Sequence, residues 1–415
     1  MFNFLKSHKK NYMIKNDLQE YDIRYNFPLS YLNLINKDIE QINKNLEEDY
    51  KKQIKNLKST IDIMLLLDFK DCYYEFISDY VGVNYLELIY YIQDDHIQDK
   101  LEDLSLSIND VMSDDMKIYI ESYYDNDLNK DLVKFNMKYR YDQLFIIDPV
   151  KLFNQAFENQ YKNSFQSIVG MNNYNQSVIA DFKTRPNILI SGQTGRGKSN
   201  IGNQLLLSLM GQYSKEELDI IIFDETKVEF YVYKLSDYVS HHIIEYEDMF
   251  EKLNQLNTES NRRLNTLHEH KVTNIDQYNN ITNQDNKDLM KRIVIYIDEC
   301  MNLSKESIQL IKQISKQSQF TGIHFIISSM QTSTQNSNII DLMNDKNYHY
   351  LLFKGLHHYL FNGEYDDLFN NLNIHEFVYY YLNENNQRVF ERCRGCYMSM
   401  KSIDKITAYL HHKED

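Results

Sequence analysis

Residues 192–199 constrain this chain more than any other stretch. They read Gly-Gln-Thr-Gly-Arg-Gly-Lys-Ser and match the phosphate-binding pattern G-x-x-x-x-G-K-[ST]. Before this loop, residues 187–191 (Asn-Ile-Leu-Ile-Ser) contain a short apolar run that favours a buried strand; after it, residues 201–210 suit a helix closed by Gly211. Strand, glycine loop and helix in this order make a cradle of backbone N–H groups at a helix N-terminus. The sequence therefore predicts that a nucleotide binds here.

The residue types of the loop have expected roles. Glycines let the backbone curl so that its N–H groups point at phosphate oxygens. Lys198 is expected to reach the β- and γ-phosphates, and the Ser199 hydroxyl to ligate Mg²⁺. The predicted cofactor-binding residues are Gly192, Gln193, Thr194, Gly195, Arg196, Gly197, Lys198 and Ser199.

A second nucleotide-site pattern follows about one hundred residues downstream. Residues 293–297 are an apolar run that predicts a strand, and Asp298 and Glu299 come directly after it. In many P-loop ATPases the first such carboxylate holds the Mg²⁺ shell and the second polarises the attacking water. Buried strands often end in acidic residues, so this pattern indicates a nucleotide site only in combination with the phosphate-binding loop upstream. Asp298 is the candidate metal ligand, and Glu299 is the candidate general base, acting with Lys198.

The charge of the chain is unevenly distributed. The net charge is −15, and the first 150 residues, with 18 basic and 28 acidic side chains, account for −10 of it. This balance argues against a broadly basic nucleic-acid surface. The remaining residues are close to neutral and can still form a locally basic channel.

The composition also bounds where the chain works. No apolar run approaches the roughly 20 residues that a membrane-spanning helix needs, and no apolar signal segment follows Met1. The four cysteines do not make a disulfide framework. Cys393 and Cys396 supply only two of the four ligands of a zinc site, so we interpret them as reduced structural thiols. We expect a cytoplasmic protein without a transmembrane segment, or one held at the membrane periphery by a partner.

Two domains are predicted. Residues 1–150 are expected to form an acidic, mainly helical accessory domain. Its long helix spans about 35–67, with an apolar stripe at spacings of three and four, and shorter helical pieces span 85–97 and 114–123.

Residues 151–415 alternate strand-like and helix-like stretches, which indicates an α/β fold with a mainly parallel sheet covered on both faces. Two strands at 378–382 and 388–397 are expected to pair at the edge of that sheet. A helix is expected near 337–344.

Several collinear segments resemble the motor domain of the FtsK/SpoIIIE DNA translocases, including relatives that serve conjugative elements. Together with the two nucleotide motifs they extend from about residue 169 to residue 351. The resembling segments are 178–182 with 185–192, 223–230, 259–263, 272–279 and 321–328. The resemblance implies a RecA-like P-loop core, ATP with Mg²⁺ as the nucleotide, a homo-hexameric ring and movement along double-stranded DNA without sequence specificity.

The resemblance also suggests a residue that acts on the neighbouring subunit. The stretch 259–263, Glu-Ser-Asn-Arg-Arg, is similar to the Glu-x-x-x-Arg helix of the family. Arg262 or Arg263 would then be the arginine finger that reaches the neighbour's phosphates. A solvated pair of charges on a helix is the alternative interpretation.

One segment departs from the family pattern. After its Gly-Ile-His strand the family has Ala-Thr-Gln-Arg-Pro, whereas this chain has Ser-Ser-Met-Gln-Thr at 328–332. Met330 therefore occupies the position of the glutamine that senses the γ-phosphate, and Gln331 follows one step later. Either a local shift restores a polar sensor, or hydrolysis is slowed or differently gated.

These patterns lead to one main functional hypothesis and two alternatives. The main one is an ATP-dependent DNA translocase or coupling ATPase that acts in transfer, segregation or replication of a mobile element. A relaxase or a secretion channel would be its partner through residues 1–150. The alternatives are a type VII-like protein-secretion ATPase, and an ATP-dependent switch or scaffold that does not translocate.

Overall fold

The computed structural model describes most of the chain between Asn26 and His412. The described residues are 26–412 except 34–36, 69–71, 82–84, 94–96, 112–117, 126–127, 139–146, 159–163, 226–228, 283–288, 300–302, 331–345, 356, 358–360, 362–364, 366–367, 370–371 and 384. The helix expected near 337–344 and the side chain of Gln331 lie outside these ranges. None of the described helices is long and apolar enough to cross a membrane.

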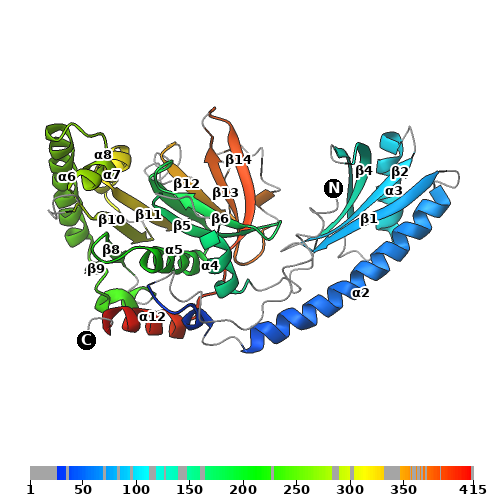
Figure 1. Ribbon diagram of the computed structural model, residues 1–415, viewed down its shortest axis with the longest axis horizontal. Helices are drawn as coiled ribbons and strands as arrows, with labels where there is room; N and C mark the ends of the chain where they lie inside the picture. The colour runs from blue at the N-terminus through cyan, green and yellow to red at the C-terminus, as the bar shows by residue number, and fades with distance from the viewer. Residues whose placement is uncertain are drawn as a thin grey trace.

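A ten-stranded sheet forms the centre of the part of the chain that follows the accessory region (Figure 1), with strand order β6-β5-β14-β13-β12-β7-β11-β10-β8-β9. Strands β12, β7, β11, β10, β8 and β9 are mutually parallel, and the pairs β12–β13, β13–β14, β14–β5 and β5–β6 are antiparallel. The mixed, mainly parallel α/β sheet predicted from the sequence is confirmed. The strands are β5 (Gln166–Asn172), β6 (Ser177–Asp181), β7 (Asn187–Gly192), β8 (Leu218–Asp224), β9 (Val239–Ile243), β10 (Arg292–Asp298), β11 (Ile323–Met330), β12 (Tyr348–Phe353), β13 (Glu376–Leu382) and β14 (Arg388–Arg394).

Helices cover both faces of this sheet, which explains why its central strands are apolar at nearly every position. Alternate residues of one strand enter two different cores: Val294 and Tyr296 pack on the side of α5, whereas Ile295 and Ile297 pack on the side of α6 and α8. The helices and 3₁₀ turns of this part are α4 (Pro149–Glu158), α5 (Lys198–Gln212), η4 (Tyr231–Leu235), α6 (Tyr246–Glu269), α7 (Ile275–Thr282), α8 (Lys305–Thr321) and α12 (Met400–His412).

The final strand pair lies inside the sheet, so the prediction that it forms the edge was wrong. β13 and β14 do pair with each other, but β14 also pairs with β5 through Cys393–Asn172 and Arg394–Met171. Strands β5 and β6, which precede the phosphate-binding loop in sequence, complete the sheet beyond them. The order of strands in a sheet is a long-range property, and local residue patterns do not contain it.

The accessory region combines two helices with a four-stranded antiparallel sheet of order β1-β2-β4-β3. The long helix is confirmed, but the expected helical pieces at 85–97 and 114–123 were wrong, because both stretches contain strands. Along β2, Leu86, Leu88, Tyr90 and Ile92 are buried, which is the period of two of a strand with one covered face. The elements are α2 (Lys37–Asp68), β1 (Tyr73–Val81), β2 (Tyr85–Gln93), α3 (Ile97–Val111), β3 (Ile118–Asp125) and β4 (Lys130–Lys138).

The first described residues pack against the ten-stranded sheet's helices before the chain forms the accessory sheet. The short turn η2 (Leu29–Asn33) lies against α12 and α4, and Leu32 is buried in the core beneath α5. Asn26 donates its backbone N–H to Gly211 O at 2.7 Å and its side-chain amide to Met210 O at 2.9 Å. Asn26 therefore satisfies carbonyl groups at the C-terminal end of α5, the helix that follows the phosphate-binding loop.

Candidate nucleotide-binding site

The phosphate-binding loop joins the end of β7 to the start of α5, as the sequence predicts. Gly195 and Gly197 have φ angles of +72° and +102°, in the region where a side chain is unfavourable. A Cβ atom on Gly197 would also come 2.5 Å from Nδ1 of His375. The backbone N–H of His375 donates to Arg196 O at 3.0 Å. The loop is therefore held from outside by the residue that precedes β13.

Lys198 lies at the centre of the site and is only 6% exposed. Its Nζ donates to Gln193 O at 3.3 Å and lies 3.5 Å from Glu299 Oε1. Gln193 in turn donates its backbone N–H to Lys354 O at 3.0 Å, which ties the loop to the end of β12. The fold thus brings together the lysine of the loop and the candidate base, which are 101 positions apart in the sequence.

Asp298 ends β10 and is almost completely buried. Burial, together with the charges of Glu299 and Glu229, raises the pKa of Asp298 to about 7, although a hydrogen bond from the Tyr296 hydroxyl opposes the shift. That hydroxyl lies 3.2 Å from Asp298 Oδ1. A buried carboxyl among other carboxyls is an environment that favours a bound cation, because the cation would stabilise the charged form.

Glu299 follows Asp298 with a φ angle of +55°, which is uncommon for a residue with a side chain. Its Oε2 accepts a hydrogen bond from the backbone N–H of Met330 at 2.8 Å. The hydroxyl of Thr194, in the phosphate-binding loop, donates to the sulfur of Met330. Met330, the residue at the sensor position, therefore contacts both the loop and the candidate base.

The two arginines of α6 have different environments, which favour Arg262 over Arg263 as the finger candidate. Arg263 is 4% exposed, and its guanidinium donates to Glu259, to Lys291 O and to Thr321 O, the last two at 2.8 Å. Lys291 and Thr321 precede β10 and β11, so Arg263 lies at the opposite edge of the sheet from the phosphate-binding loop. Its hydrogen bonds hold it inside this subunit.

Arg262 remains available as a finger candidate. Its side chain is 59% exposed, and its guanidinium donates two hydrogen bonds to the Glu259 carboxylate, at 2.6 and 2.7 Å. The two arginines lower the pKa of Glu259 to about 2, with the hydrogen bond from Arg262 as the largest cause. A surface ion pair of this kind is weak and exchanges readily with other partners.

The residues present fit a Mg²⁺–nucleotide complex. In the part of the chain that the structure describes, no three His, Cys, Asp or Glu residues lie close enough to hold a metal by themselves. Mg²⁺ bound with a nucleotide usually takes one or two protein oxygens and completes its shell with phosphate and water oxygens. Ser199 at the start of α5 and Asp298 at the end of β10 would supply those protein oxygens.

Sequence reasoning missed Tyr296 and His375 as residues of the site. Tyr296 stands two positions before Asp298 on one strand, so its side chain shares the face of Asp298, and this spacing was a usable signal. A Cβ atom on Gly202 of α5 would come 2.3 Å from the Tyr296 hydroxyl, which shows how closely helix and strand approach. His375 had no local signal, because only the fold brings it to the loop.

Comparison with known sequences supports the same assignment. Residues 152–345 match the model of the FtsK/SpoIIIE family. DNA translocase FtsK of Helicobacter pylori (strain J99) is 29% identical over 160 residues, which are 37% of this chain and 19% of the relative. DNA translocase SftA of Bacillus subtilis is 25% identical over 194 residues, or 45% of this chain and 20% of the relative. The matched segment spans about a fifth of the length of these relatives.

Solved structures share the fold at low sequence identity. The monomer form of TcpA, the conjugation coupling protein of pCW3, solved with ATPγS, has a TM-score of 0.52 at 16% identity and covers 87% of this chain and 100% of TcpA. The cytoplasmic domain of EccC, the type VII secretion ATPase of Thermomonospora curvata, has a TM-score of 0.50 at 16% identity, and the match covers 64% of this chain and 32% of that domain. The family-model match, the shared fold and the geometry around Lys198 agree: residues 152–345 of this chain are similar to the FtsK/SpoIIIE family and have the fold of its P-loop ATPase relatives.

Proposed function

We propose that this chain is an ATP-dependent DNA translocase or coupling ATPase of the FtsK/SpoIIIE type. It moves double-stranded DNA, without sequence specificity, during transfer, segregation or replication of a mobile element. One observation carries the proposal: in a segment of this family, Lys198, Glu299 and Met330 meet at one edge of the sheet. That arrangement is suited to coupling the state of the nucleotide to the position of β11.

The residues of the site divide the chemistry among them. The backbone of residues 192–199 and the ammonium of Lys198 bind the phosphates of ATP, and Ser199 and Asp298 hold Mg²⁺, which neutralises charge that develops on the phosphates. Glu299 accepts the proton of the attacking water. Met330 holds the Glu299 carboxylate through its backbone N–H, so the end of β11 and the base move together.

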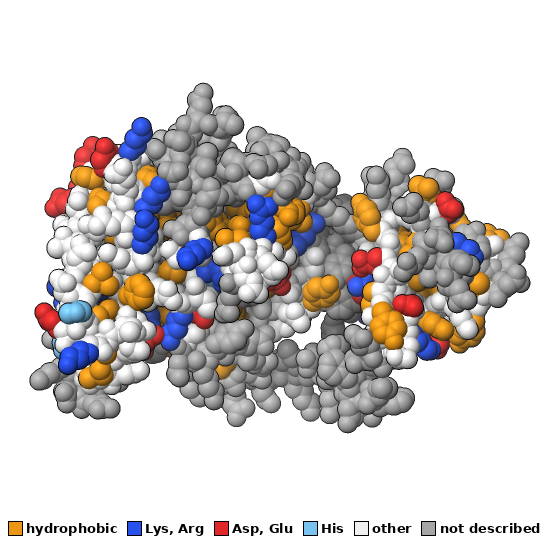
Figure 2. Space-filling view, turned by 90° about the horizontal axis from the view of Figure 1, so that it is seen from above, with side chains coloured by type: hydrophobic (Ala, Val, Ile, Leu, Met, Phe, Trp, Pro, Cys, Tyr) orange, Lys and Arg blue, Asp and Glu red, His pale blue; other side chains and the backbone are white. Residues whose placement is uncertain are grey.

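The proposal extends to the assembly. A homo-hexameric ring would place the exposed Arg262 of one subunit near the phosphates bound by its neighbour. Several Lys and Arg side chains are spread over the face seen in Figure 2, with some Asp and Glu side chains on the same face, and these basic side chains would contact the phosphates of DNA. The acidic accessory region would dock on a relaxase or a secretion channel, either in the cytoplasm or at the membrane periphery.

The proposal is tested by ATP hydrolysis with and without linear duplex DNA. We expect duplex DNA to stimulate hydrolysis several-fold, and Lys198→Ala to abolish both the basal and the stimulated rates. Hydrolysis that ignores DNA but responds to an added polypeptide substrate would instead support a protein-secretion ATPase.

Met330 favours one further candidate, an ATP-dependent switch or scaffold that does not translocate. A thioether cannot donate a hydrogen bond to a γ-phosphate, as a glutamine amide can. A protein that binds ATP tightly, hydrolyses it slowly and shows no movement on DNA in a triplex-displacement assay would fit this second candidate.

A further inference from the structure

The loop that follows β14 is bound to the first turns of α5 through backbone groups. Asn200, the first residue after the phosphate-binding motif, donates its side-chain amide to Cys396 O at 2.5 Å and accepts from the backbone N–H of Met398 at 2.8 Å. The N–H of Cys396 donates to Gln204 Oε1 at 2.9 Å. The backbone on both sides of Tyr397 is therefore fixed to the helix that begins at the nucleotide site.

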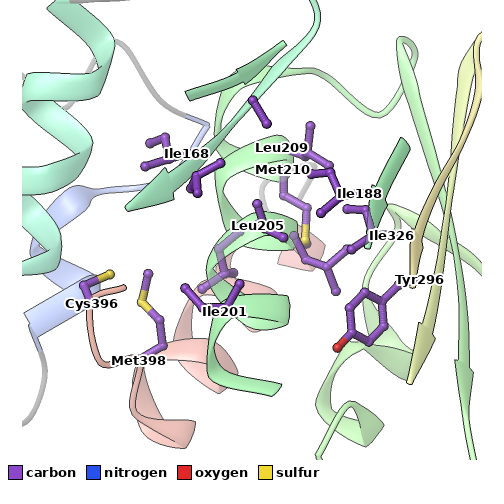
Figure 3. Close-up of a cluster of buried hydrophobic side chains, with 14 of the residues drawn as sticks. Ile168, Ile188, Ile201, Leu205, Leu209, Met210, Tyr296, Ile326, Cys396 and Met398 are labelled. Carbon is purple, nitrogen blue, oxygen red and sulfur yellow. The ribbon is translucent and has the colours of Figure 1, made fainter. Parts of the chain in front are cut away.

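Close packing reinforces these hydrogen bonds. A Cβ atom on Gly395 would come 2.2 Å from Cδ1 of Ile201, so the loop passes directly over the first turn of α5. In Figure 3, Cys396 and Met398 lie beside Ile201 on one side of this helix, while Tyr296 lies on the other side. The Tyr397 side chain is different from its neighbours, because it is 48% exposed.

Tyr397 also stands next to the residue that holds the phosphate-binding loop. Its ring and that of His375 have centroids 6.3 Å apart in an edge-to-face arrangement. The N–H of His375 donates to Arg196 O, and the N–H of Gly395 donates to His375 O at 3.2 Å. Two backbone hydrogen bonds, both made by His375, thus connect the segment that carries the exposed Tyr397 ring to the phosphate-binding loop.

The strand order shows which end of a nucleotide this ring would meet. Glu299 follows β10 and Met330 ends β11, and both strands lie on the same side of β7. These two residues mark the γ-phosphate end of the proposed site. His375 and Tyr397 adjoin β13 and β14, on the other side of β7. A nucleotide whose terminal phosphate lies by Glu299 therefore extends its nucleoside toward Tyr397.

We propose that Tyr397 is the nucleobase-binding residue of this site, with its ring as a stacking platform for the base of ATP. The inference rests on the proposed nucleotide binding at residues 192–199 and adds the contact that the phosphate motif lacks. Asn200 acts as the positioning residue, because it fixes the backbone on both sides of the platform to the start of α5.

Two probes separate base binding from phosphate binding: a fluorescent ATP analogue and inorganic tripolyphosphate as its competitor. Tyr397→Ala should weaken the affinity for ATP about fivefold or more, which is the usual effect of one lost stacking contact. The affinity for tripolyphosphate should stay unchanged. Tyr397→Phe should bind ATP like the wild type. Tyr119→Ala is the matched control, because Tyr119 is an exposed tyrosine of the accessory sheet.

Each result decides the proposal. A loss of affinity for ATP but not for tripolyphosphate in Tyr397→Ala supports the proposal. An unchanged affinity for ATP, or an equal loss of affinity for both probes, overturns it. Thermal melting of each variant shows whether a loss reflects unfolding; the exposed position of Tyr397 predicts unchanged melting. If the wild-type protein binds neither probe, the proposed nucleotide site itself is wrong. If the wild type binds both probes and Lys198→Ala binds neither, the nucleotide site stands, and an unchanged ATP affinity in Tyr397→Ala then overturns the stacking platform alone.

Discussion

Lys198 and Glu299 form an ion pair across the nucleotide site, with Nζ and Oε1 separated by 3.5 Å. The lysine is 6% exposed and the glutamate 21% exposed, so water screens their attraction only in part. The same ammonium also donates to Gln193 O in the phosphate-binding loop. The candidate base and the phosphate-binding group therefore constrain each other, and changes at either one should separate binding from hydrolysis.

Glu299→Gln should reduce ATP hydrolysis at least about 100-fold, because a positioned general base contributes roughly 10²–10⁴-fold to such a reaction. ATP affinity should change little, since the amide keeps the shape of the side chain and can still accept from Met330 N–H. Steady-state hydrolysis and equilibrium binding of a fluorescent ATP analogue measure the two effects. Glu306→Gln, in the exposed first turn of α8, is the control. If Glu299→Gln hydrolyses ATP at the wild-type rate, the assignment of Glu299 as the general base is wrong.

Met330→Gln should increase the rate of ATP hydrolysis, by about tenfold, without tightening ATP binding. The glutamine amide would supply a donor beside Thr194 and Glu299, where the thioether supplies none. Rapid-quench measurement of a single turnover isolates this step from product release. Met330→Leu, which is also apolar, should hydrolyse ATP at the wild-type rate. An unchanged rate in Met330→Gln would mean that the side chain at this position does not limit hydrolysis.

Arg263→Ala should lower the free energy of unfolding by about 2–4 kcal/mol, because it leaves the buried carbonyl groups of Lys291 and Thr321 without this donor and removes one of the two arginines that bond Glu259. Arg262→Ala should cost less than about 1 kcal/mol, as expected for an exposed ion pair. Chemical denaturation of both variants makes the comparison. If Arg262 acts on the neighbouring subunit, its loss should lower hydrolysis only under conditions where the protein assembles. Equal destabilisation by the two substitutions would contradict the structural role of Arg263.

Stability should fall as the pH decreases below about 6.5, with His324 as one cause. Its Nδ1 lies 2.8 Å from Pro186 O, and its ring stacks on Phe165. Burial, followed by the charge of Arg292, lowers the pKa of His324 to about 3. In the unfolded chain His324 is protonated below about pH 6.5, whereas in the folded protein it is protonated only near pH 3. Stability is therefore lost progressively as the pH falls from about 6.5 to 3.

Denaturation midpoints at pH 7, 6 and 5 provide the measurement for His324. Each such histidine adds about 1.4 kcal/mol per pH unit to the slope once the pH is below the pKa of the unfolded chain. His349, whose pKa burial also lowers to about 3, contributes in the same direction. His324→Asn should therefore have a shallower pH dependence than the wild type, whatever its stability at pH 7. Identical slopes would mean that His324 titrates normally in the folded protein.

Local residue patterns were sufficient wherever one segment contains the whole signal. The phosphate-binding loop, the apolar strand before Asp298 and the long helix α2 all lie where the sequence predicts them. The stretch that became β2 shows the limit of such reasoning. Its acidic residues suggested a surface helix, although Leu86, Leu88 and Tyr90 already alternate with the period of a strand.

The sequence by itself determined the phosphate-binding pattern at residues 192–199 and the alternating α/β core to which this motif belongs. The tertiary structure decided which distant groups surround that loop: Glu299 and Met330 on one side, His375 and Tyr397 on the other. It also separated Arg263, buried and bonded inside the subunit, from its exposed neighbour Arg262. A short motif encodes the backbone shape of its own loop, but strand order and packing set the distances between residues far apart in the chain.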